Sequence, residues 1–345
     1  MSLTSQQVSN ARELLRRFLR PTRLVRAERI APDSDAKIYF KLETELPTGS
    51  FKPRGAIYAL MKTLEQQAGK DERSTSEQSL AERSKKERAR EVRPVKGVVA
   101  ASTGNHGAAV AYAARLANLP ATIVMPESPN PVKRARITAL GASVMEVEWE
   151  PDSLANAAAA FAEEHDYYFL NDASDDLVPI GTATIAAEIL DELPNPDVII
   201  VPMGDTALIR GVASEAKRRH PGVRIVGVQA AQAPSYVRSW QEGRVVTMKT
   251  VETIADGLAT YVPLERNVRA IRELVDDVCL VSEDEMMKAI GKLLFEEHVI
   301  AEPAGAAATA AYLQNPTAYA GRTVVLLITG SNIPHELLRQ AATLR

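Results

Sequence analysis

Short apolar runs alternate with amphipathic or alanine-rich stretches along the chain, most clearly from residue 97 onward. The apolar runs predict strands at 97–101, 121–125, 143–147, 167–170, 197–202, 224–229 and 323–329. The stretches between them predict helices at 107–118, after 131, after 152, and near 181–193, 207–219, 283–297 and 304–313. Strands that are apolar throughout are typical of parallel sheets covered on both faces. We therefore predict an α/β fold with two open, doubly wound, largely parallel sheets and flanking helices.

The N-terminal segment predicts a further helix that ends before Pro21. Its apolar positions fall on one side, at Val8, Ala11, Leu14, Leu15, Phe18 and Leu19. An Arg-rich amphipathic start also suits a mitochondrial presequence, but Glu13 and the short lead-in favour a cytoplasmic protein. The segment lacks the apolar block of a secretory signal, and no apolar run reaches the roughly 18 residues of a membrane span.

The composition limits the function classes. The 345 residues are 46% hydrophobic and 25% charged, which is ordinary for a globular protein of about two domains. Lys and Arg number 41 against 44 Asp and Glu, so there is no basic surplus for nucleic acid. A lone cysteine, Cys279, excludes a disulfide framework within the chain. The five histidines show no metal-ligand spacing. A small-molecule partner is therefore expected, without nucleic acid, membrane or metal.

One charged segment interrupts the α/β pattern. Residues 71–93 contain 13 charged residues out of 23, with only Leu80 and Val92 as large aliphatic side chains. Such a piece buries too little apolar surface to offset its ordering entropy. We expect a solvated insertion or linker over 65–96; a partner-docking or regulatory arm is the alternative.

Lys52 is the first candidate for chemistry. A strand at 38–43 leads into a Pro-Thr-Gly turn, and Lys52 follows at the expected start of a helix. It could be an ordinary surface lysine. However, the positive end of a helix disfavours a second cation, so an amine there is expected to have a lowered pKa. A neutral amine is what Schiff-base chemistry needs.

Three other turns follow predicted strands. The turn at 101–107 (ASTGNHG) offers backbone N–H groups to an anion such as a carboxylate. There Asn105 adds amide donors and His106 adds a titratable ring, unless His106 is simply a buried, hydrogen-bonded histidine. The turn at 201–211 (VPMGDTALIRG) has the geometry of a phosphate site, and the run at 324–332 (VVLLITGSN) ends in small and hydroxyl residues.

The order of these motifs carries a resemblance over nearly the whole chain. TGSFKPRGA (48–56), ASTGNHG (101–107), TIADGLA (253–259), AEPAGAAATAA (301–311) and TGSN (329–332) follow one another. With this order the chain resembles the fold-type II family of pyridoxal-phosphate (PLP) enzymes, which have a tryptophan synthase β-like fold. It is most similar to the branch of threonine dehydratase and serine racemase.

The resemblance implies PLP as cofactor and assigns residues to it. Lys52 would form the Schiff base and act as the catalytic base, with Phe51 beside the ring. Asn105 would bind the phenolic oxygen of PLP, and Thr329 would face its pyridine nitrogen. The phosphate would be held by Gly204, Asp205, Thr206, Ala207 and Leu208. Gly257 and Glu302 fall in motifs near the active site without an assigned role.

The resemblance also places the substrate carboxylate on the second motif. It would be bound by Ser102, Thr103, Gly104, Asn105 and His106. Thr103 occupies the place where racemases carry a serine as a second acid or base, so it is a catalytic candidate. Its extra methyl group crowds that face, which favours elimination over racemisation.

Two departures from the family pattern stand out. The phosphate loop, usually a run of glycines, is GDTAL here, and it brings Asp205 near a dianion. Arg210, one turn into the helix, is a candidate counter-charge, and Thr206 a candidate hydroxyl donor. Gln229 and Ser235 stand where cation-binding members have carboxylates. Since hard cations prefer carboxylate oxygens, we predict no cation there.

The activity implied is β-elimination of a small β-hydroxy amino acid, threonine or serine, to a 2-oxo acid and ammonia. Another fold-type II reaction (threonine synthase, β-replacement, 3-hydroxyaspartate ammonia-lyase, racemase) and a non-catalytic amino-acid- or PLP-binding protein remain alternatives. By the same resemblance, 1–64 and 175–345 would form the large PLP domain, 97–174 a small mobile domain, and the protein a homodimer.

Overall fold

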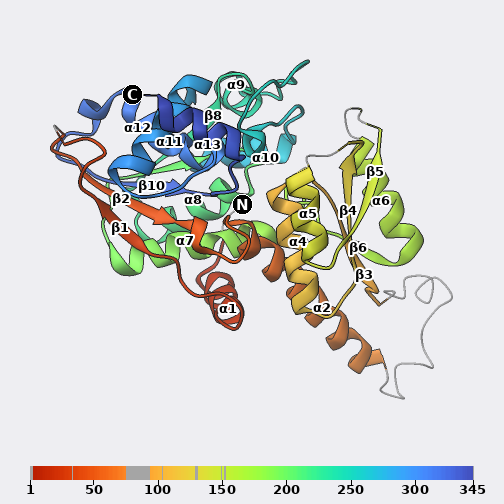
Figure 1. Ribbon diagram of the computed structural model, residues 1–345. Helices are drawn as coiled ribbons and strands as arrows, with labels where there is room; N and C mark the ends of the chain where they lie inside the picture. Colours follow the sequence, from red (N-terminus) through yellow and green to blue (C-terminus); the bar gives the residue numbers. More distant parts are fainter. Residues whose placement is uncertain are drawn as a thin grey trace. The chain divides into compact units, whose positions relative to one another are not determined.

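The computed structural model describes residues 3–32, 34–74, 94–102, 104–128, 131–148, 150 and 153–344 (Figure 1). Thr103 and most of the charged segment, residues 75–93, lie outside this described part. The chain divides into two compact units, Met1–Gly55 with Asp172–Arg345, and Ala56–Asn171. Helix α2 (Lys52–Ser74) begins in the first unit and continues in the second.

The first unit is built on a six-stranded sheet of order β1-β2-β10-β7-β8-β9. The strands are β1 (Leu24–Ala27), β2 (Lys37–Leu42), β7 (Val198–Pro202), β8 (Arg224–Ala230), β9 (Asp277–Val281) and β10 (Thr323–Ile328). Strand β1 pairs antiparallel with β2, and every other pair is parallel. Ile328 pairs with Leu42, and Leu326 with Ile200, so β2, β10 and β7 end at the same edge. The loops after these strands carry three of the predicted motifs.

Helices cover both faces of this sheet (Figure 1). They are α1 (Ser5–Arg16), α7 (Val178–Glu192), α8 (Ala207–Arg219), α9 (Ser235–Glu242), α10 (Glu265–Leu274), α11 (Glu283–Glu296), α12 (Pro303–Gln314) and α13 (His335–Thr343). Three short 3₁₀ turns, η1 (Glu43–Glu45), η2 (Asp256–Leu258) and η3 (Pro316–Tyr319), lie in the connections. Thr4 is the N-cap of helix α1, and it forms a capping box with Gln7, in which each side chain accepts the backbone N–H of the other residue.

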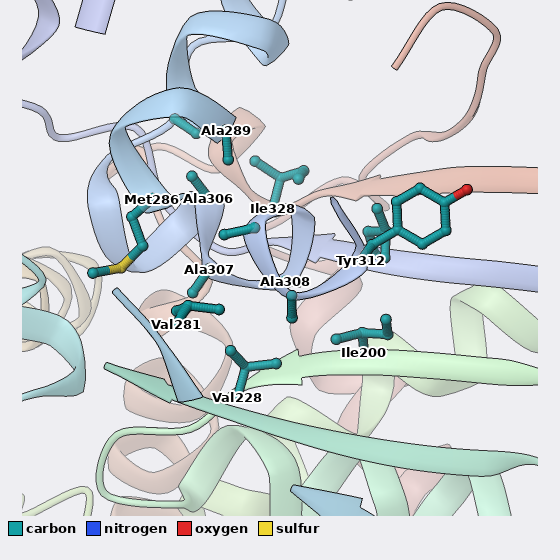
Figure 2. Close-up of a cluster of buried hydrophobic side chains, with 14 of the residues drawn as sticks. Ile200, Val228, Val281, Met286, Ala289, Ala306, Ala307, Ala308, Tyr312 and Ile328 are labelled. Carbon is teal, nitrogen blue, oxygen red and sulfur yellow. The ribbon is translucent and has the colours of Figure 1, made fainter. Parts of the chain in front are cut away.

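The face under α12 has an apolar core (Figure 2). Ala306, Ala307 and Ala308 of α12 are fully buried against strand residues such as Ile200 and Val228. Alanine side chains leave room for the helix to lie close to the sheet. The alanine run therefore brings the start of α12 next to the strand ends.

On the opposite face, α7 is held close to two other helices through glycines. A Cβ added to Gly181 of α7 would lie 2.3 Å from the carbonyl oxygen of Arg54 in α2. A Cβ on Gly211 of α8 would lie 2.3 Å from the carbonyl oxygen of Pro179 in α7. These contacts leave no space for a side chain, so α7 fixes where the first turns of α2 and α8 lie.

The second unit contains a four-stranded, all-parallel sheet of order β5-β4-β3-β6. Its strands are β3 (Gly97–Ala101), β4 (Ala121–Pro126), β5 (Ser143–Val147) and β6 (Tyr167–Phe169), and its helices, besides most of α2, are α4 (Asn105–Leu116), α5 (Pro131–Ala139) and α6 (Ser153–His165). Helix α6 covers one face, and α4 and α5 cover the other (Figure 1). Val99, Val124, Leu154 and Ala158 form the buried core under α6.

The predicted α/β fold with two largely parallel sheets is confirmed. Strands β1 and β9 and helices α9, α10 and α13 were not predicted. No described helix has both the length and the apolar character needed to cross a bilayer. The division into cofactor domain, insertion and small mobile domain at residues 64, 97 and 175 stays a prediction.

Candidate cofactor site

Lys52 is the first residue of α2, and the loop that leads into α2 is hydrogen-bonded to the loop after β10. The Phe51 N–H donates to the Thr329 carbonyl at 3.0 Å, and the Ser331 N–H donates to the Gly49 carbonyl at 2.9 Å. Two of the sequence motifs, separated by nearly 280 residues, are thus joined through their backbones. This pairing fixes the position from which Lys52 projects.

The Lys52 amine lies among carboxylates. Its Nζ forms an ion pair with Asp172 and lies 5.2 Å from the centre of the Phe51 ring. Burial lowers the pKa of Lys52, but Asp172, Asp205 and Glu302 together outweigh burial and raise the pKa above its ordinary value. The expectation of a lowered pKa is therefore wrong for the described structure. That expectation followed from the helix end alone and did not include the three carboxylates that raise the pKa.

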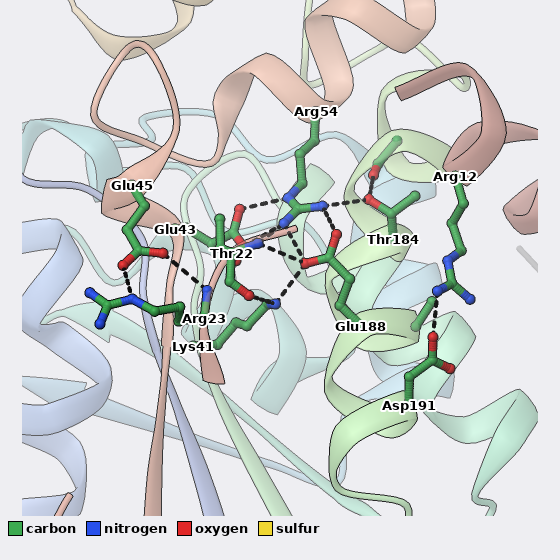
Figure 3. A network of polar contacts seen from close by, with 12 residues as sticks. Arg12, Thr22, Arg23, Lys41, Glu43, Glu45, Arg54, Thr184, Glu188 and Asp191 are labelled. Carbon is green, nitrogen blue, oxygen red and sulfur yellow. Dashed lines mark hydrogen bonds and ion pairs between the residues drawn. The ribbon is translucent and has the colours of Figure 1, made fainter. Parts of the chain in front are cut away.

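A buried ion-pair network holds the first turn of α2 (Figure 3). Arg54 donates from Nε to Glu43 at 2.7 Å and from Nη1 to Glu188 at 2.6 Å. Lys41 also donates to Glu188, at 2.6 Å. Burial of Arg54 lowers its pKa, but the two glutamates raise it well above its ordinary value. The guanidinium therefore stays charged and ties α2 to η1, directly after β2, and to α7.

The GDTAL turn after β7 forms a tight cradle. A Cβ on Gly204 would lie 2.3 Å from the Gly257 carbonyl oxygen, so the two loops are in backbone contact. Thr206 caps α8 in the left-handed conformation, with φ 69°. Its hydroxyl is buried and has no hydrogen-bond partner among the described residues. Ala207 and Leu208 begin α8, and their N–H groups belong to the unsatisfied first turn of the helix. This arrangement suits an anion.

Asp205 and Arg210 are each bonded to neighbouring loops. The Asp205 carboxylate accepts a hydrogen bond from the Thr260 hydroxyl at 3.2 Å. Arg210 donates to the Ala173 carbonyl at 3.3 Å, and burial lowers the pKa of its guanidinium. The suggestion that Arg210 balances Asp205 stays a prediction.

Glu302 joins the start of α12 to the loop after β10. Its Oε2 accepts from the Asn332 N–H at 3.0 Å, and a Cβ on Gly330 would lie 2.3 Å from its Oε1. The Thr329 hydroxyl donates to the Ala304 carbonyl at 3.4 Å and is buried. The motifs at 48–52, 204–208, 253–259, 301–311 and 329–332 therefore converge in the first unit.

The predicted substrate residues belong to the second unit. The Ser102 hydroxyl accepts from the Gly104 N–H at 3.1 Å and the Gly107 N–H at 2.8 Å, so it shapes the turn before α4. His106 is buried, with Nε2 at 2.9 Å from the Leu170 carbonyl. This is the buried, hydrogen-bonded histidine considered above as the alternative to a substrate-binding role. Asn105 begins α4. The roles of these residues stay predictions, and Thr103 lies outside the described residues.

Two residues near these motifs, Asp172 and Lys133, were not predicted from the sequence. Asp172 comes three residues after β6, so its place after a parallel strand was the available signal. Lys133 lies over the turn at Gly104, where an added Cβ would be 3.5 Å from its Nζ. Lys133 thus brings an amine close to the turn before α4.

The segment around Gln229 and Ser235, for which the sequence predicts no cation, is hydrogen-bonded internally. Gln229 Oε1 accepts the N–H groups of Tyr236 and Val237, both at 3.1 Å, at the start of α9. Within the described part of the chain, no three His, Cys, Asp or Glu side chains gather as a metal site would require.

Comparisons with known proteins agree on one class. The sequence model of the family described as "Pyridoxal-phosphate dependent enzyme" matches residues 15–330. An L-threonine ammonia-lyase of Geobacter sulfurreducens is 36% identical over 94% of this chain and 75% of the relative. An L-threo-3-hydroxyaspartate ammonia-lyase of Saccharomyces cerevisiae is 29% identical over 96% of this chain and 93% of the relative. The structure of maize serine racemase superposes with a TM-score of 0.85 at 26% identity, covering 99% of this chain and 97% of the racemase.

The chain belongs to the pyridoxal-phosphate dependent enzyme family, and its two-sheet architecture is that of fold-type II. Its similarity places it with the threonine dehydratase and serine racemase branch. The residues of the first unit fit the cofactor. A lysine begins α2, and the cradle at 204–208 has a helix N-terminus and a buried hydroxyl to which no described residue is hydrogen-bonded.

Proposed function

We propose that the protein is a PLP-dependent ammonia-lyase that acts on a small β-hydroxy amino acid, threonine or serine. The net reaction converts the amino acid to a 2-oxo acid and ammonia; the water lost by elimination is regained by hydrolysis. The observation that carries the proposal is the convergence of Lys52, the cradle at 204–208 and the loop at 329–332 in one unit. The relative named as an L-threonine ammonia-lyase supports the choice of reaction.

Five consecutive residues would hold the phosphate. Backbone N–H groups of Gly204, Asp205, Thr206, Ala207 and Leu208 are at or next to the start of α8, where the helix dipole favours an anion. The buried Thr206 hydroxyl would add a donor in place of the glycine usual in the family. Because Asp205 bonds to Thr260, part of its carboxylate is already committed within the protein.

Around the ring of the cofactor, three side chains have proposed roles. Phe51 would lie beside the ring, Asn105 would donate to the phenolic oxygen, and Thr329 would face the pyridine nitrogen. A hydroxyl cannot hold a proton on that nitrogen as a carboxylate does. Negative charge developing at the substrate would then be stabilised less, which favours prompt loss of a β-hydroxyl group over a long-lived carbanion.

When bound, PLP supplies an electron sink for charge that develops at the α-carbon of the substrate. The Lys52 amine would take the α-proton, since it projects from a fixed backbone position next to the cradle. Ser102, Gly104, Asn105 and His106, with Thr103, would hold the substrate carboxylate, and Lys133 would add a positive charge beside that turn. We also propose Thr103 as a second acid or base, as the sequence implied.

A substrate panel tests this proposal. Purified protein with PLP is incubated with L-threonine, L-serine, L-threo-3-hydroxyaspartate and O-phospho-L-homoserine, and 2-oxo acid, ammonia and inorganic phosphate are quantified. We expect both products from threonine or serine, and none from Lys52→Ala. Turnover of only hydroxyaspartate or the phosphorylated substrate would overturn the substrate assignment. Failure to take up PLP would favour the non-catalytic alternative.

We further propose that the protein works in the cytoplasm and that it is a homodimer, the latter as the resemblance implies. Light scattering of the purified full chain measures the assembly, with twice the 37.5 kDa chain mass expected. A single chain mass would contradict this.

A further inference from the structure

We infer that Asp172 is the positioning residue for Lys52: its carboxylate orients the lysine amine and holds a proton on it until the amine joins the cofactor. The inference rests on the proposed role of Lys52 and adds a residue that the motifs did not include. It concerns groups that belong to one compact unit.

Lys52 and Asp172 are in direct contact. The Lys52 Nζ donates a hydrogen bond to Asp172 Oδ2 and forms an ion pair with it. Both side chains are largely buried, with exposed fractions of 17% for Lys52 and 11% for Asp172. A charge-assisted bond in such surroundings is stronger and more directional than one in water.

The backbone beside Asp172 is held by polar side chains, two of them buried. The carbonyl of Ala173 accepts hydrogen bonds from Asn267 Nδ2 at 2.9 Å and from Arg210 at 3.3 Å. Arg266 donates to the carbonyl of Ser174. Asn267 is fully buried and Arg210 nearly so. Side chains from α8 and α10 thus fix the segment that presents the carboxylate.

Three carboxylates act on the Lys52 amine, and they are not equivalent. Asp205 bonds to Thr260, and Glu302 bonds to the Asn332 backbone, so each is oriented by another group. Both act on Lys52 through their charge alone, whereas Asp172 adds a hydrogen bond. Asp172 therefore sets the direction of the amine as well as its charge.

The charge of the Asp172 carboxylate affects the pH at which Lys52 can capture the cofactor. An amine attacks an aldehyde only in its neutral form, so the Lys52 ammonium must first release a proton. Removing the negative charge of Asp172 leaves the effect of burial less opposed, and the pKa of the amine falls. Capture should then occur at lower pH, but from a less well oriented amine.

The first experiment follows cofactor capture by full-length protein stripped of PLP. The rate of PLP uptake is measured against pH by absorbance, and borohydride reduction with peptide mass mapping identifies the labelled lysine. For Asp172→Asn we expect the pH midpoint of the rate to fall by about one unit or more. Asp172→Glu, which keeps the charge, should restore most of the wild-type midpoint.

Asp176→Asn is the matched control, because Asp176 is in the same connecting segment but is 74% exposed and pairs with Arg266 at 3.3 Å. Its midpoint should equal that of the wild type. A midpoint in Asp172→Asn that is unchanged, or shifted no more than in the control, would overturn the inference. Reduction onto another lysine would overturn the inference and the proposed function together.

A second measurement needs no variant. Competitive acetylation of the stripped wild-type protein across pH yields the pKa of Lys52 itself. A value above the ordinary lysine pKa of about 10.4 is expected, and a value at or below it would overturn the inference. Neither readout depends on turnover. Absence of 2-oxo acid from every substrate, with Lys52 titrating as expected, would reject only the proposed reaction.

Discussion

Arg54 and Glu188 join α2 to α7 through two parallel hydrogen bonds, from Nη1 to Oε1 at 2.6 Å and from Nη2 to Oε2 at 2.8 Å (Figure 3). Bidentate geometry of this kind fixes orientation as well as distance. Because Arg54 is two residues after Lys52, the pair also sets how the first turn of α2 presents the proposed catalytic lysine.

Replacing Arg54 by methionine should strongly destabilise the protein. The arginine side chain is 2% exposed, and its loss leaves the carboxylates of Glu43 and Glu188 without their main cation. Removing one partner of a buried ion pair typically costs about 3–5 kcal/mol. Denaturant unfolding of Arg54→Met and wild type measures the loss. Arg23→Met is the control, because Arg23 is 71% exposed and pairs with Glu45 at the surface. Its cost should stay below about 1 kcal/mol.

The lowered pKa of Glu188 predicts that part of the free energy of unfolding is lost in acid. Burial raises its pKa, but Arg54 and Lys41 outweigh burial and lower the pKa below its ordinary value. The unfolded chain, with a glutamate pKa of about 4.3, therefore takes up the proton at a higher pH than the folded protein does. The stabilisation is fully present above that pH and is lost as the pH falls through the folded pKa.

Glu188→Gln removes this titration. The difference in free energy of unfolding between wild type and variant should be largest near neutral pH and should shrink below about pH 4. Urea unfolding at pH 7, 5, 4 and 3 measures it. Glu336→Gln, at an exposed pair with Arg339, is the control, and its cost at pH 7 should stay below about 1 kcal/mol. A difference that stays constant with pH would mean that the ionisation of Glu188 is not coupled to folding.

The fold was predictable because its strands are buried on both faces and therefore stand out as apolar runs. The run at 198–202 is fully buried, and the prediction of 197–202 for that strand differs by one residue. By contrast, β1 (LVRA) is an antiparallel edge strand with an exposed arginine, and α10 is a strongly polar helix. The apolar signal of β1 is too weak to separate it from a loop, and α10 has few apolar residues, although Val268, Ala270 and Ile271 form one buried face.

The site was predictable only where motif and topology coincide. Lys52, Thr206 and Thr329 follow parallel strands whose ends lie at one sheet edge, so their convergence could be expected. The pairing of Lys52 with Asp172 could not be expected from the sequence. The two residues are 120 positions apart in the chain, and Asp172 is in a loop without a motif. The pKa of the amine was mispredicted for the same reason, since long-range charges are not visible in local sequence.

Gly204→Ala should weaken PLP binding while leaving the fold intact. A Cβ at this position would lie 2.3 Å from the Gly257 carbonyl oxygen, which is backbone, so one of the two loops must move. We expect the Kd for PLP to rise at least about tenfold, equivalent to about 1.4 kcal/mol. Titration of stripped protein followed by absorbance measures it. Gly222→Ala, where the nearest atom would be 3.7 Å away, should bind PLP as the wild type does.

Thr206→Gly should change stability and cofactor affinity in opposite directions. The left-handed conformation, φ 69°, costs a β-branched residue about 1 kcal/mol or more, whereas glycine adopts it freely. The free energy of unfolding of the stripped variant should therefore be higher than that of the stripped wild type. The gain should be up to about 1 kcal/mol, after the entropy of glycine in the unfolded chain is subtracted. Loss of the buried hydroxyl should nevertheless raise the Kd for PLP several-fold, by about the net value of one hydrogen bond.

Thr206→Ser separates the two effects, because serine keeps the hydroxyl and lacks the β-branch. It should bind PLP nearly as tightly as the wild type, and Thr206→Gly should not. The Kd for PLP and the free energy of unfolding of the stripped protein are compared for all three proteins. Equal affinity of wild type and Thr206→Gly would show that the threonine hydroxyl does not contact the phosphate. The strained conformation would then need another explanation within the loop, since no functional gain would offset its cost.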